Sequence, residues 1–345
     1  MADRVLVTGI SGFIGGHVAL ELLKQGYRVR GSVRDPARVD AVRATLGRAG
    51  ADLDRLEFVA LDLLADDGWD AAMDGVRYLQ HTASPFVTAM PADRMALVRP
   101  AVEGTRRALA AALGATVERV VVTSSVAAIM YGHDRARTAP FTAADWTDLG
   151  GRDINAYVES KTRAEHEAWG IMDGAERHDD LTTINPGVVF GPLLDGDPGT
   201  SVGLLARMFD GSLPVAARIG LVIVDVRDVA AAHAAAMVAP AVRGQRLPMG
   251  AGTRSLLEIA AILRTALPAH AGRLPRHEVP DWLVRMASVF DSDARGNLGE
   301  LGVVKRLDAA AVEALLGRPL IGVEEAVTAA ARSLIAEGLV GSKKG

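Results

Sequence analysis

Cysteine is missing from all 345 residues of the chain, which excludes disulfide bonds and thiolate metal sites. A large charge of either sign is missing too. The formal net charge is -4, so the composition does not indicate a nucleic-acid-binding or membrane-binding surface. The 8 histidines show no metal-ligand spacing such as H-E-x-x-H, and we expect no metal site. With 49% hydrophobic and 23% charged residues, the composition is that of an ordinary globular protein.

A long uninterrupted hydrophobic run is also absent. The nearest candidate, residues 5–20, has no formal charge unless His17 is protonated, but four glycines interrupt it and Glu21 and Lys24 follow it. It is short for a membrane span and lacks the A-x-A-like cleavage site of a signal peptide. We interpret the segment as a strand, a loop and a helix, and we expect a cytoplasmic protein.

Tyrosine and lysine are scarce, and this scarcity makes one pair of residues informative. The chain has 4 Tyr, and only 5 of its 38 basic residues are Lys. Tyr157 is nevertheless followed four residues later by Lys161, an arrangement expected only about 0.06 times by chance in a chain of this composition. Residues at positions i and i+4 share a helix face, so both side chains can point into one site.

Short apolar runs alternate with helical patterns through the first half of the chain. β-Branched runs such as residues 120–122 indicate strands that are buried on both faces. The alternation predicts an α/β protein with a doubly wound parallel sheet, the Rossmann fold. The expected strands are 4–8, 28–33, 56–60, 76–81, 119–123 and 181–185, and the expected helices are 13–25, 36–49, 67–73, 92–113 and 155–171.

The alternation weakens after Pro186. Glycine and proline cluster at residues 190–200, one strand–helix unit returns at 221–238, and the remainder indicates short helices and loops. We therefore expect two discontinuous domains. They are a Rossmann domain of residues 1–185 and 221–250, and a smaller C-terminal α/β domain of residues 186–220 and 251–340, which we expect to bind the ligand and the substrate respectively.

A glycine-rich turn separates the first expected strand from the first expected helix. Such glycines make a tight turn and admit a pyrophosphate close to the backbone, where the N–H groups and dipole of the helix bind it. Three glycines at this spacing arise about 0.4 times by chance in a chain with 36 glycines, so their place between strand and helix is the stronger argument. The expected cofactor-binding residues here are Gly9, Ser11, Gly12, Phe13, Ile14 and Gly15.

The end of the second expected strand bears on which dinucleotide binds. NAD sites typically have an acidic residue there for the ribose 2′-hydroxyl. Here Arg34 ends the strand and Arg38 follows it, and a guanidinium suits the 2′-phosphate of NADP(H). We expect NADP(H), with NAD(H) as the less favoured alternative if Asp35 binds the ribose instead. Asp62 and Leu63, past the third strand, are expected to border the adenine.

Three residues suit carbonyl reduction, which needs a hydride and a proton for the developing alkoxide. Tyr157 is the expected proton donor, and an ammonium from Lys161 nearby would lower its pKa. Ser125, at the carboxyl edge of the sheet, is expected to donate a hydrogen bond to the substrate oxygen. Lys161 is also expected to hold the nicotinamide ribose. The alternative is an exposed Tyr and Lys on an amphipathic helix, which Ser125 and the glycine turn disfavour.

Several segments together resemble one known family. The glycine turn, Ser125 and the pattern Tyr157-x-x-Ser160-Lys161 are similar to those of the extended short-chain dehydrogenases/reductases. The chain is more closely similar to the dihydroflavonol reductase-like branch, which includes cinnamoyl-CoA reductases and microbial NADPH-dependent aldehyde, methylglyoxal and ketone reductases. The segments that carry this similarity are 31–35, 81–86, 121–125, 185–192, 224–230 and 315–319.

The resemblance implies a carbonyl reductase with Ser125, Tyr157 and Lys161 as its catalytic residues. One departure is Arg107, where similar sequences often have Asn, so the packing of that helix is expected to differ. Small residues at other strand ends leave room for the nicotinamide half of the cofactor. Together with Tyr157 and Lys161, the further cofactor contacts that we expect are Thr82, Ala83, Ser84, Thr123, Pro186, Gly187 and Val188.

The expected substrate pocket is mostly apolar, as small-molecule sites usually are. No cluster of Arg or Lys indicates a diphosphate site, so we expect a small-to-medium apolar aldehyde or ketone. The expected lining residues are Phe86, Met90, Ser125, Met130, Tyr131, Tyr157, Val188 and Met208.

Two other functions stay open at this point. One is an NAD-retaining sugar-nucleotide epimerase or dehydratase on the same scaffold, and the other is a non-catalytic NADP(H) sensor. The sequence does not name the carbonyl compound, the stereochemistry or the physiological direction. Helices near 101–113 and 157–169 could form a dimer interface, so both a monomer and a homodimer are open.

Overall fold

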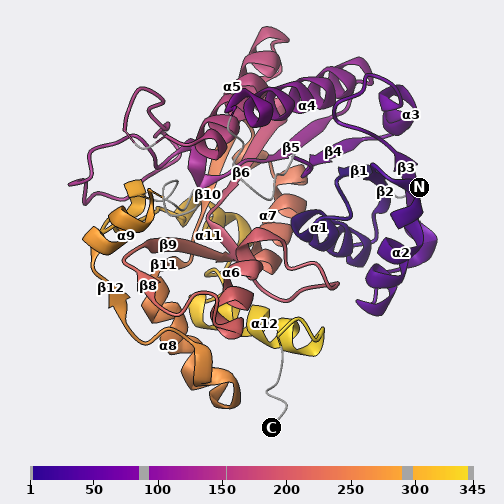
Figure 1. Cartoon of the computed structure of the whole chain (residues 1–345). Coiled ribbons are helices and arrows are strands. Elements are labelled where there is room, and N and C mark those ends of the chain that lie inside the picture. The colour runs from indigo at the N-terminus through magenta and orange to yellow at the C-terminus, as the bar shows by residue number, and fades with distance from the viewer. Residues whose placement is uncertain (1–2, 85–92, 153, 290–297, 341–345) are drawn as a thin grey trace.

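The largest element of the fold is a parallel seven-stranded sheet, seen in a computed structural model that describes residues 3–84, 93–152, 154–289 and 298–340 (Figure 1). The strand order reverses at the first strand of the chain, and doubly wound folds bind ligands outside the strand ends at such a switch point. In spatial order the strands are β10 (Gln245–Met249), β6 (Leu181–Pro186), β5 (Arg119–Thr123), β4 (Tyr78–His81), β1 (Arg4–Thr8), β2 (Arg28–Val33) and β3 (Leu56–Ala60).

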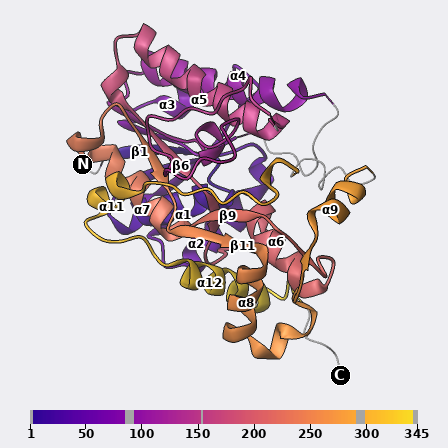
Figure 2. The same cartoon turned by 90° about the vertical axis from the view of Figure 1, so that its left-hand side faces the viewer.

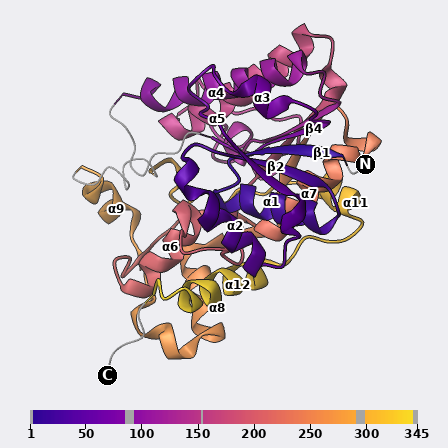
Figure 3. The same cartoon turned by 90° about the vertical axis from the view of Figure 1, so that its right-hand side faces the viewer.

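Helices cover both faces of this sheet. Val5 and Val7 of β1 belong to one hydrophobic cluster and Leu6 between them belongs to another, because successive side chains of a strand point to opposite faces. This is the doubly wound Rossmann fold that the sequence predicts. One face carries α1 (Phe13–Lys24), α2 (Val39–Arg48), α7 (Val226–Val238) and α11 (Ala310–Leu316), and the other carries α3 (Trp69–Met73), α4 (Met95–Gly114) and α5 (Ala156–Gly174) (Figures 1 and 3).

A smaller α/β unit lies beside the sheet and has a hydrophobic cluster of its own (Figure 2). Its three-stranded sheet has the order β11 (Gly252–Ser255), β9 (Gly220–Asp225), β7 (Val188–Phe190). The helices α6 (Gly199–Asp210), α8 (Leu256–Ala266) and α12 (Val323–Ala336) supply most of the cluster, and a short ribbon of β8 (Ala216–Ala217) and β12 (Glu278–Val279) leads to α9 (Asp281–Ala287).

The chain passes from the large sheet to the small one at Gly187. A Cβ at this position would lie 2.3 Å from the backbone oxygen of Val222 in β9, so only glycine allows the two backbones to approach this closely. β9 pairs in the small sheet, whereas α7 and β10, which follow it, belong to the large unit. The expected domain division at residues 185, 220 and 250 stays a prediction.

The predicted bounds of four strands, β1, β2, β3 and β5, match the structure residue for residue. The strand expected at 76–81 begins only at Tyr78, because the Val76 N–H closes the turn after α3 by donating to the Met73 carbonyl. The helix expected at 36–49 is divided into a 3₁₀ turn, Pro36–Arg38, and α2. No helix in the part of the chain that the structure describes is both long and apolar enough to cross a membrane.

The two helices that we expect at a dimer interface, α4 and α5, pack against each other within the chain. Ion pairs join them, Arg106 to Glu167 at 2.7 Å and Arg94 to Glu159 at 2.6 Å. Arg107 of α4 takes part in neither of these ion pairs. It contacts Asp66 and donates to the Leu63 carbonyl at 3.4 Å, so it ties α4 to the loop after β3. The choice between a monomer and a homodimer stays a prediction.

Candidate active site

The glycine turn forms a cradle that has no room for side chains. Gly9 has a φ of +70°, and a Cβ there would lie 2.9 Å from Ala83 Cα. A Cβ on Gly15 would lie 2.2 Å from the Gly9 carbonyl oxygen. The first N–H groups of a helix have no intrahelical acceptor, and the next helix, α1, has neither a side-chain cap nor an acidic residue in its first turn to bind them. This arrangement fits the pyrophosphate of a dinucleotide.

The carboxylate that could bind an NAD ribose already accepts a hydrogen bond through one of its oxygens. Asp35 Oδ1 accepts a hydrogen bond from the Ala37 N–H at 3.0 Å and caps the 3₁₀ turn after β2. Arg34 and Arg38 on either side of it are exposed. Asp62 likewise closes a turn, since its Oδ1 accepts from the N–H of Leu64 at 2.9 Å. The strand end therefore presents two guanidinium groups beside a carboxylate that already has a partner.

Hydrogen bonds lock the ends of β1 and β4 together next to the glycine turn. The Thr82 hydroxyl donates to the Thr8 carbonyl at 2.5 Å, and the Ala83 N–H donates to Thr8 Oγ1 at 3.2 Å. His81 Nδ1 lies 2.9 Å from Thr8 Oγ1. The backbone that is expected to face the nicotinamide half is therefore held at several points.

Two buried histidines lie beneath this edge of the sheet. The His233 ring bridges β4 and β5, with Nδ1 donating to Gln80 Oε1 at 2.7 Å and Nε2 accepting from the Thr123 hydroxyl at 2.8 Å. The Gln80 amide donates to the His233 carbonyl at 3.0 Å, which orients the amide oxygen toward Nδ1. Burial lowers the pKa of His233 to about 3. Burial, and secondly the positive charge of Lys161, lower the pKa of His81 to about 4.

Lowering the pH is expected to destabilise the protein because of these two rings. Their folded-state pKa values lie below the ordinary value of 6.5, so below pH 6.5 the unfolded chain takes up protons that the folded chain does not. The contribution of these two histidines to the free energy of unfolding is therefore fully present above pH 6.5. It decreases toward pH 4 by about 1.4 kcal/mol per pH unit for each histidine. Urea unfolding from pH 7 to pH 4.5 measures this slope. His233→Gln should reduce it by the contribution of one histidine, about 1.4 kcal/mol per pH unit, and the exposed His277→Gln should not change it; an unaltered slope in the first variant contradicts the assignment.

The helix that carries Tyr157 and Lys161 begins at a capped end. The Asn155 side chain accepts from the N–H of Val158 at 2.9 Å. Tyr157 is 37% exposed and Lys161 is half-buried, and the Lys161 Nζ lies 6.0 Å from the centre of the tyrosine ring. The positive charge of Lys161 reaches His81 on β4, which places this end of α5 beside the carboxyl edge of the sheet.

Ser125 lies in the turn that packs against this helix. It is 7% exposed, and its Oγ accepts from the N–H of Ala127 at 3.1 Å. The hydroxyl proton of Ser125 is thus left to donate elsewhere. The Thr162 hydroxyl of α5 is shared between the Val158 carbonyl of the same helix at 2.8 Å and the Ala127 carbonyl of the turn at 3.3 Å, so it joins the helix to the turn. The structure thereby brings the elements that carry Ser125, Tyr157 and Lys161 together at one edge.

A buried ion pair supports these elements from behind. Glu165 of α5 accepts from Arg246 Nε of β10 at 2.6 Å, and both side chains are almost fully buried. The same carboxylate accepts from the Ser124 hydroxyl at 2.5 Å and from the Asn185 amide at 2.7 Å. Asn185 also donates to the Ser125 carbonyl at 3.3 Å. One carboxylate therefore links the ends of β5 and β6 to the helix that carries the tyrosine.

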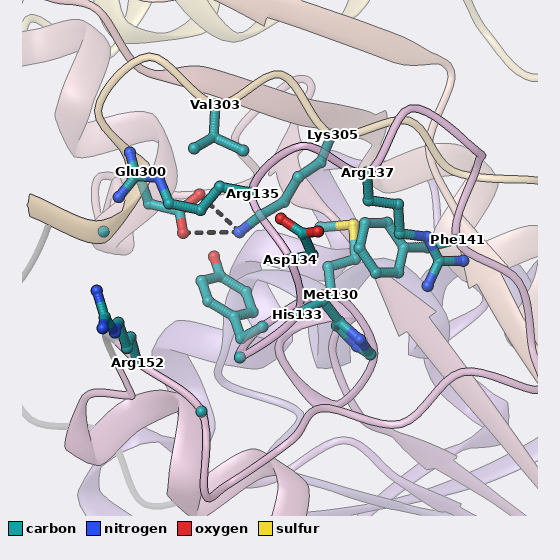
Figure 4. Close-up of a pocket in the computed structure, with 14 residues that line it drawn as sticks. Met130, His133, Asp134, Arg135, Arg137, Phe141, Arg152, Glu300, Val303 and Lys305 are labelled. Carbon is teal, nitrogen blue, oxygen red and sulfur yellow. Dashed lines mark hydrogen bonds and ion pairs between the residues drawn. The ribbon is translucent and has the colours of Figure 1, made fainter.

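A cavity of about 410 Å³ adjoins the site (Figure 4). Tyr131 in its wall is close enough to Tyr157 for the two phenols to interact electrostatically. Burial first, then the charges of Glu300 and Tyr157, raise the pKa of Tyr131 above its ordinary value. The cavity walls come from the segment after Ser125, the segment before α5 and a C-terminal loop. The lining residues are Met130, Tyr131, Gly132, His133, Asp134, Arg135, Arg137, Phe141, Gly151, Arg152, Gly299, Glu300, Val303 and Lys305.

Of the eight expected substrate residues, Ser125 and Tyr157 are not in the cavity wall, and the other six divide into three groups. Met130 and Tyr131 line the cavity, and their role as substrate contacts stays a prediction. Val188 opens β7 and is not part of the cavity wall, and Met208 is fully buried in the core of the smaller unit. Phe86 and Met90 lie outside the described residues. Sequence reasoning did not find the charged part of the wall, although the rarity of lysine that singles out Lys161 applies equally to Lys305.

Comparisons with known proteins identify the family of the chain. The chain matches the NAD dependent epimerase/dehydratase family over residues 5–247. It is 34% identical over 318 residues to ketoreductase azaE of Aspergillus niger, covering 87% of this chain and 93% of that protein. It is 36% identical to a putative dihydroflavonol 4-reductase of Synechocystis, covering 82% and 77%. Among solved structures, yeast methylglyoxal/isovaleraldehyde reductase Gre2 complexed with NADPH has a TM-score of 0.78 at 26% identity, covering 97% of this chain and 99% of that one.

Proposed function

The chain belongs to the NAD dependent epimerase/dehydratase family, and from this membership and the geometry of the site we propose that it is an NADPH-dependent carbonyl reductase. It reduces an aldehyde or ketone of small to medium size and runs in reverse as an alcohol dehydrogenase. The observation that carries the proposal is the packing of the Tyr157–Lys161 helix against the Ser125 turn at the carboxyl edge of the sheet. The relatives named as reductases support the same chemistry.

The residues of the chain have distinct tasks in this reaction. A bound reduced nicotinamide supplies the hydride that goes to the carbonyl carbon. The Tyr157 hydroxyl gives its proton to the carbonyl oxygen as negative charge develops there. Ser125, whose oxygen already accepts from the Ala127 N–H, donates its hydroxyl proton as a hydrogen bond to the same carbonyl oxygen. Lys161 holds the ribose hydroxyls with its ammonium N–H donors, and its Nζ lies 6.0 Å from the centre of the Tyr157 ring.

NADPH fits the end of β2 better than NADH does. Arg34 and Arg38 are exposed there, and Asp35, the carboxylate that a ribose 2′-hydroxyl would need, already accepts from a backbone N–H. A guanidinium binds a 2′-phosphate through charge-assisted hydrogen bonds. The solved structure of Gre2, which this chain resembles, contains NADPH.

A screen of NADPH oxidation by the purified protein over aldehydes, ketones and diketones tests the proposal. We expect turnover of at least one class, and slower turnover with NADH. Tightly bound NAD⁺ released from the purified protein would favour the epimerase or dehydratase alternative instead. NADPH binding without oxidation across the whole panel would favour the sensor.

Replacing Arg34 with alanine is expected to raise the KM for NADPH about 10-fold, because one charge-assisted contact to the 2′-phosphate is lost. The KM for NADH should stay within about two-fold, since that cofactor has no 2′-phosphate. Steady-state kinetics with both cofactors measure the difference. Arg48→Ala, at the exposed end of α2, is the matched control. Equal losses with both cofactors would contradict the role of Arg34.

A further inference from the structure

The cavity beside Tyr157 carries an excess of positive charge that carbonyl reduction itself does not need. Its wall holds four cationic side chains, Arg135, Arg137, Arg152 and Lys305, and only two carboxylates, Asp134 and Glu300. We propose that the substrate bears an anionic group, a carboxylate or a phosphate, and that Arg152 binds it. The proposal rests on the proposed function and adds a substrate class to it.

The position of the cavity makes it the place where a substrate of Tyr157 would lie. Met130 and Tyr131 follow Ser125 by a few residues, and Arg152 precedes Tyr157 by a few. Tyr131 lies within electrostatic reach of Tyr157. A compound that occupies the cavity therefore extends away from the two residues that are expected to act on its carbonyl oxygen.

Two of the four cations already have carboxylate partners. Lys305 Nζ lies 2.7 and 2.9 Å from the two oxygens of Glu300 and 3.7 Å from the centre of the Tyr131 ring. Arg137 makes a two-pronged ion pair with Asp145, at 2.8 and 3.0 Å. These pairs hold the walls together, and their charges cancel locally.

The remaining charges leave Arg152 as the group to meet an anion. Arg135 donates to the Leu301 carbonyl at 2.5 Å, and Asp134 Oδ1 accepts from the Ala136 N–H at 2.9 Å, so each of these two side chains has a partner of its own in the wall. Arg152 makes no hydrogen bond or ion pair within the part of the chain that the structure describes. Figure 4 shows its guanidinium apart from the Lys305–Glu300 pair.

The chemistry of an arginine at a cavity wall favours an anionic ligand. The planar guanidinium presents parallel N–H donors that match the oxygens of a carboxylate or phosphate. A cleft with one sign of charge also concentrates ligands of the opposite sign. Met130, Phe141 and Val303 supply apolar wall, so the preferred substrate has an apolar body, a carbonyl near Tyr157 and an anionic group near Arg152.

Paired substrates test the proposal without confusing it with the proposed function. The kcat/KM for NADPH-dependent reduction is measured for an apolar oxo acid, its methyl ester and an oxo compound with a phosphate, in wild type, Arg152→Gln and Arg152→Lys. We expect wild type to prefer an anionic compound to the ester by about 10-fold, mainly through KM. Arg152→Gln should lose this preference while reducing the ester within about two-fold of wild type, and Arg152→Lys should retain part of it. The control Arg332→Gln, an exposed arginine of α12 outside the cavity wall, should behave as wild type.

The outcomes separate the two hypotheses. Reduction of neutral carbonyls at least as efficiently as of both anions would overturn the anionic substrate and leave the carbonyl reductase in place. Equal loss of ester and acid activity in Arg152→Gln would overturn the role of Arg152. A preference for the phosphate over the oxo acid, lost in Arg152→Gln, would support the proposal and identify the anion. No turnover of any carbonyl compound by wild type would overturn the proposed function itself.

Discussion

Replacing Tyr157 with phenylalanine is expected to lower kcat for carbonyl reduction by about 10²- to 10⁴-fold, the usual contribution of a positioned proton donor. The substitution removes one oxygen atom from a side chain that is 37% exposed, so neither packing nor folding should change measurably. The ring itself remains beside the Lys161 ammonium. The rate of NADPH oxidation, with the best carbonyl compound from the screen, measures the loss.

The cofactor site provides the control for this substitution. NADPH binding, followed by fluorescence titration, should be nearly unaffected, because the glycine turn and Arg34 are unaltered. Tyr27→Phe is the matched variant, since Tyr27 precedes the amino end of β2 and so lies at the edge of the sheet opposite the site. Activity of Tyr157→Phe within a few-fold of wild type would show that another group supplies the proton.

Features encoded by neighbouring residues were predictable from the sequence. The strand bounds of β1, β2, β3 and β5 are predicted from short stretches of neighbouring residues, and they agree with the structure. The glycine turn is only partly local, because a Cβ on Gly15 would meet the nearby Gly9 carbonyl, whereas a Cβ on Gly9 would meet Ala83 at the end of another strand. The spacing of Tyr157 and Lys161 needs only a helix to place both on one side, and α5 provides it.

Features that depend on distant residues were not predictable in the same way. Glu165 and Arg246 are 81 residues apart, and nothing in either local sequence indicates that they pair. The cavity is built from three separate segments, so its charge could not be summed before their juxtaposition was known. Met208 has the spacing of a residue on an apolar helix face, and only the packing of α6 shows that this face fills the smaller core. The expectation of an apolar pocket did not include the charges at Arg152 and Lys305 for this reason.

The buried carboxylate behind the site should matter greatly for stability. Glu165→Ala is expected to lower the free energy of unfolding by about 3–5 kcal/mol, because it leaves the guanidinium of Arg246 in the core without its carboxylate. The Glu165 side chain is 0% exposed and that of Arg246 is 7% exposed, so little water can replace the lost partner. Ser124 and Asn185 lose the same acceptor. Urea unfolding near pH 7 measures the change.

Removing both charges together distinguishes the ion pair from simple loss of packing. The double variant Glu165→Leu, Arg246→Met leaves no buried charge, so it should be more stable than Glu165→Ala even though it changes more atoms. Arg246 also donates to the Ala143 carbonyl at 2.9 Å and lies over the Trp146 ring at 3.6 Å, which limits the recovery to part of the loss. If the double variant is less stable than Glu165→Ala, the dominant contribution comes from those other contacts of Arg246 and not from an uncompensated charge. In that case the contacts of Arg246 would stabilise the end of β10 more strongly than they stabilise the Ser125 turn.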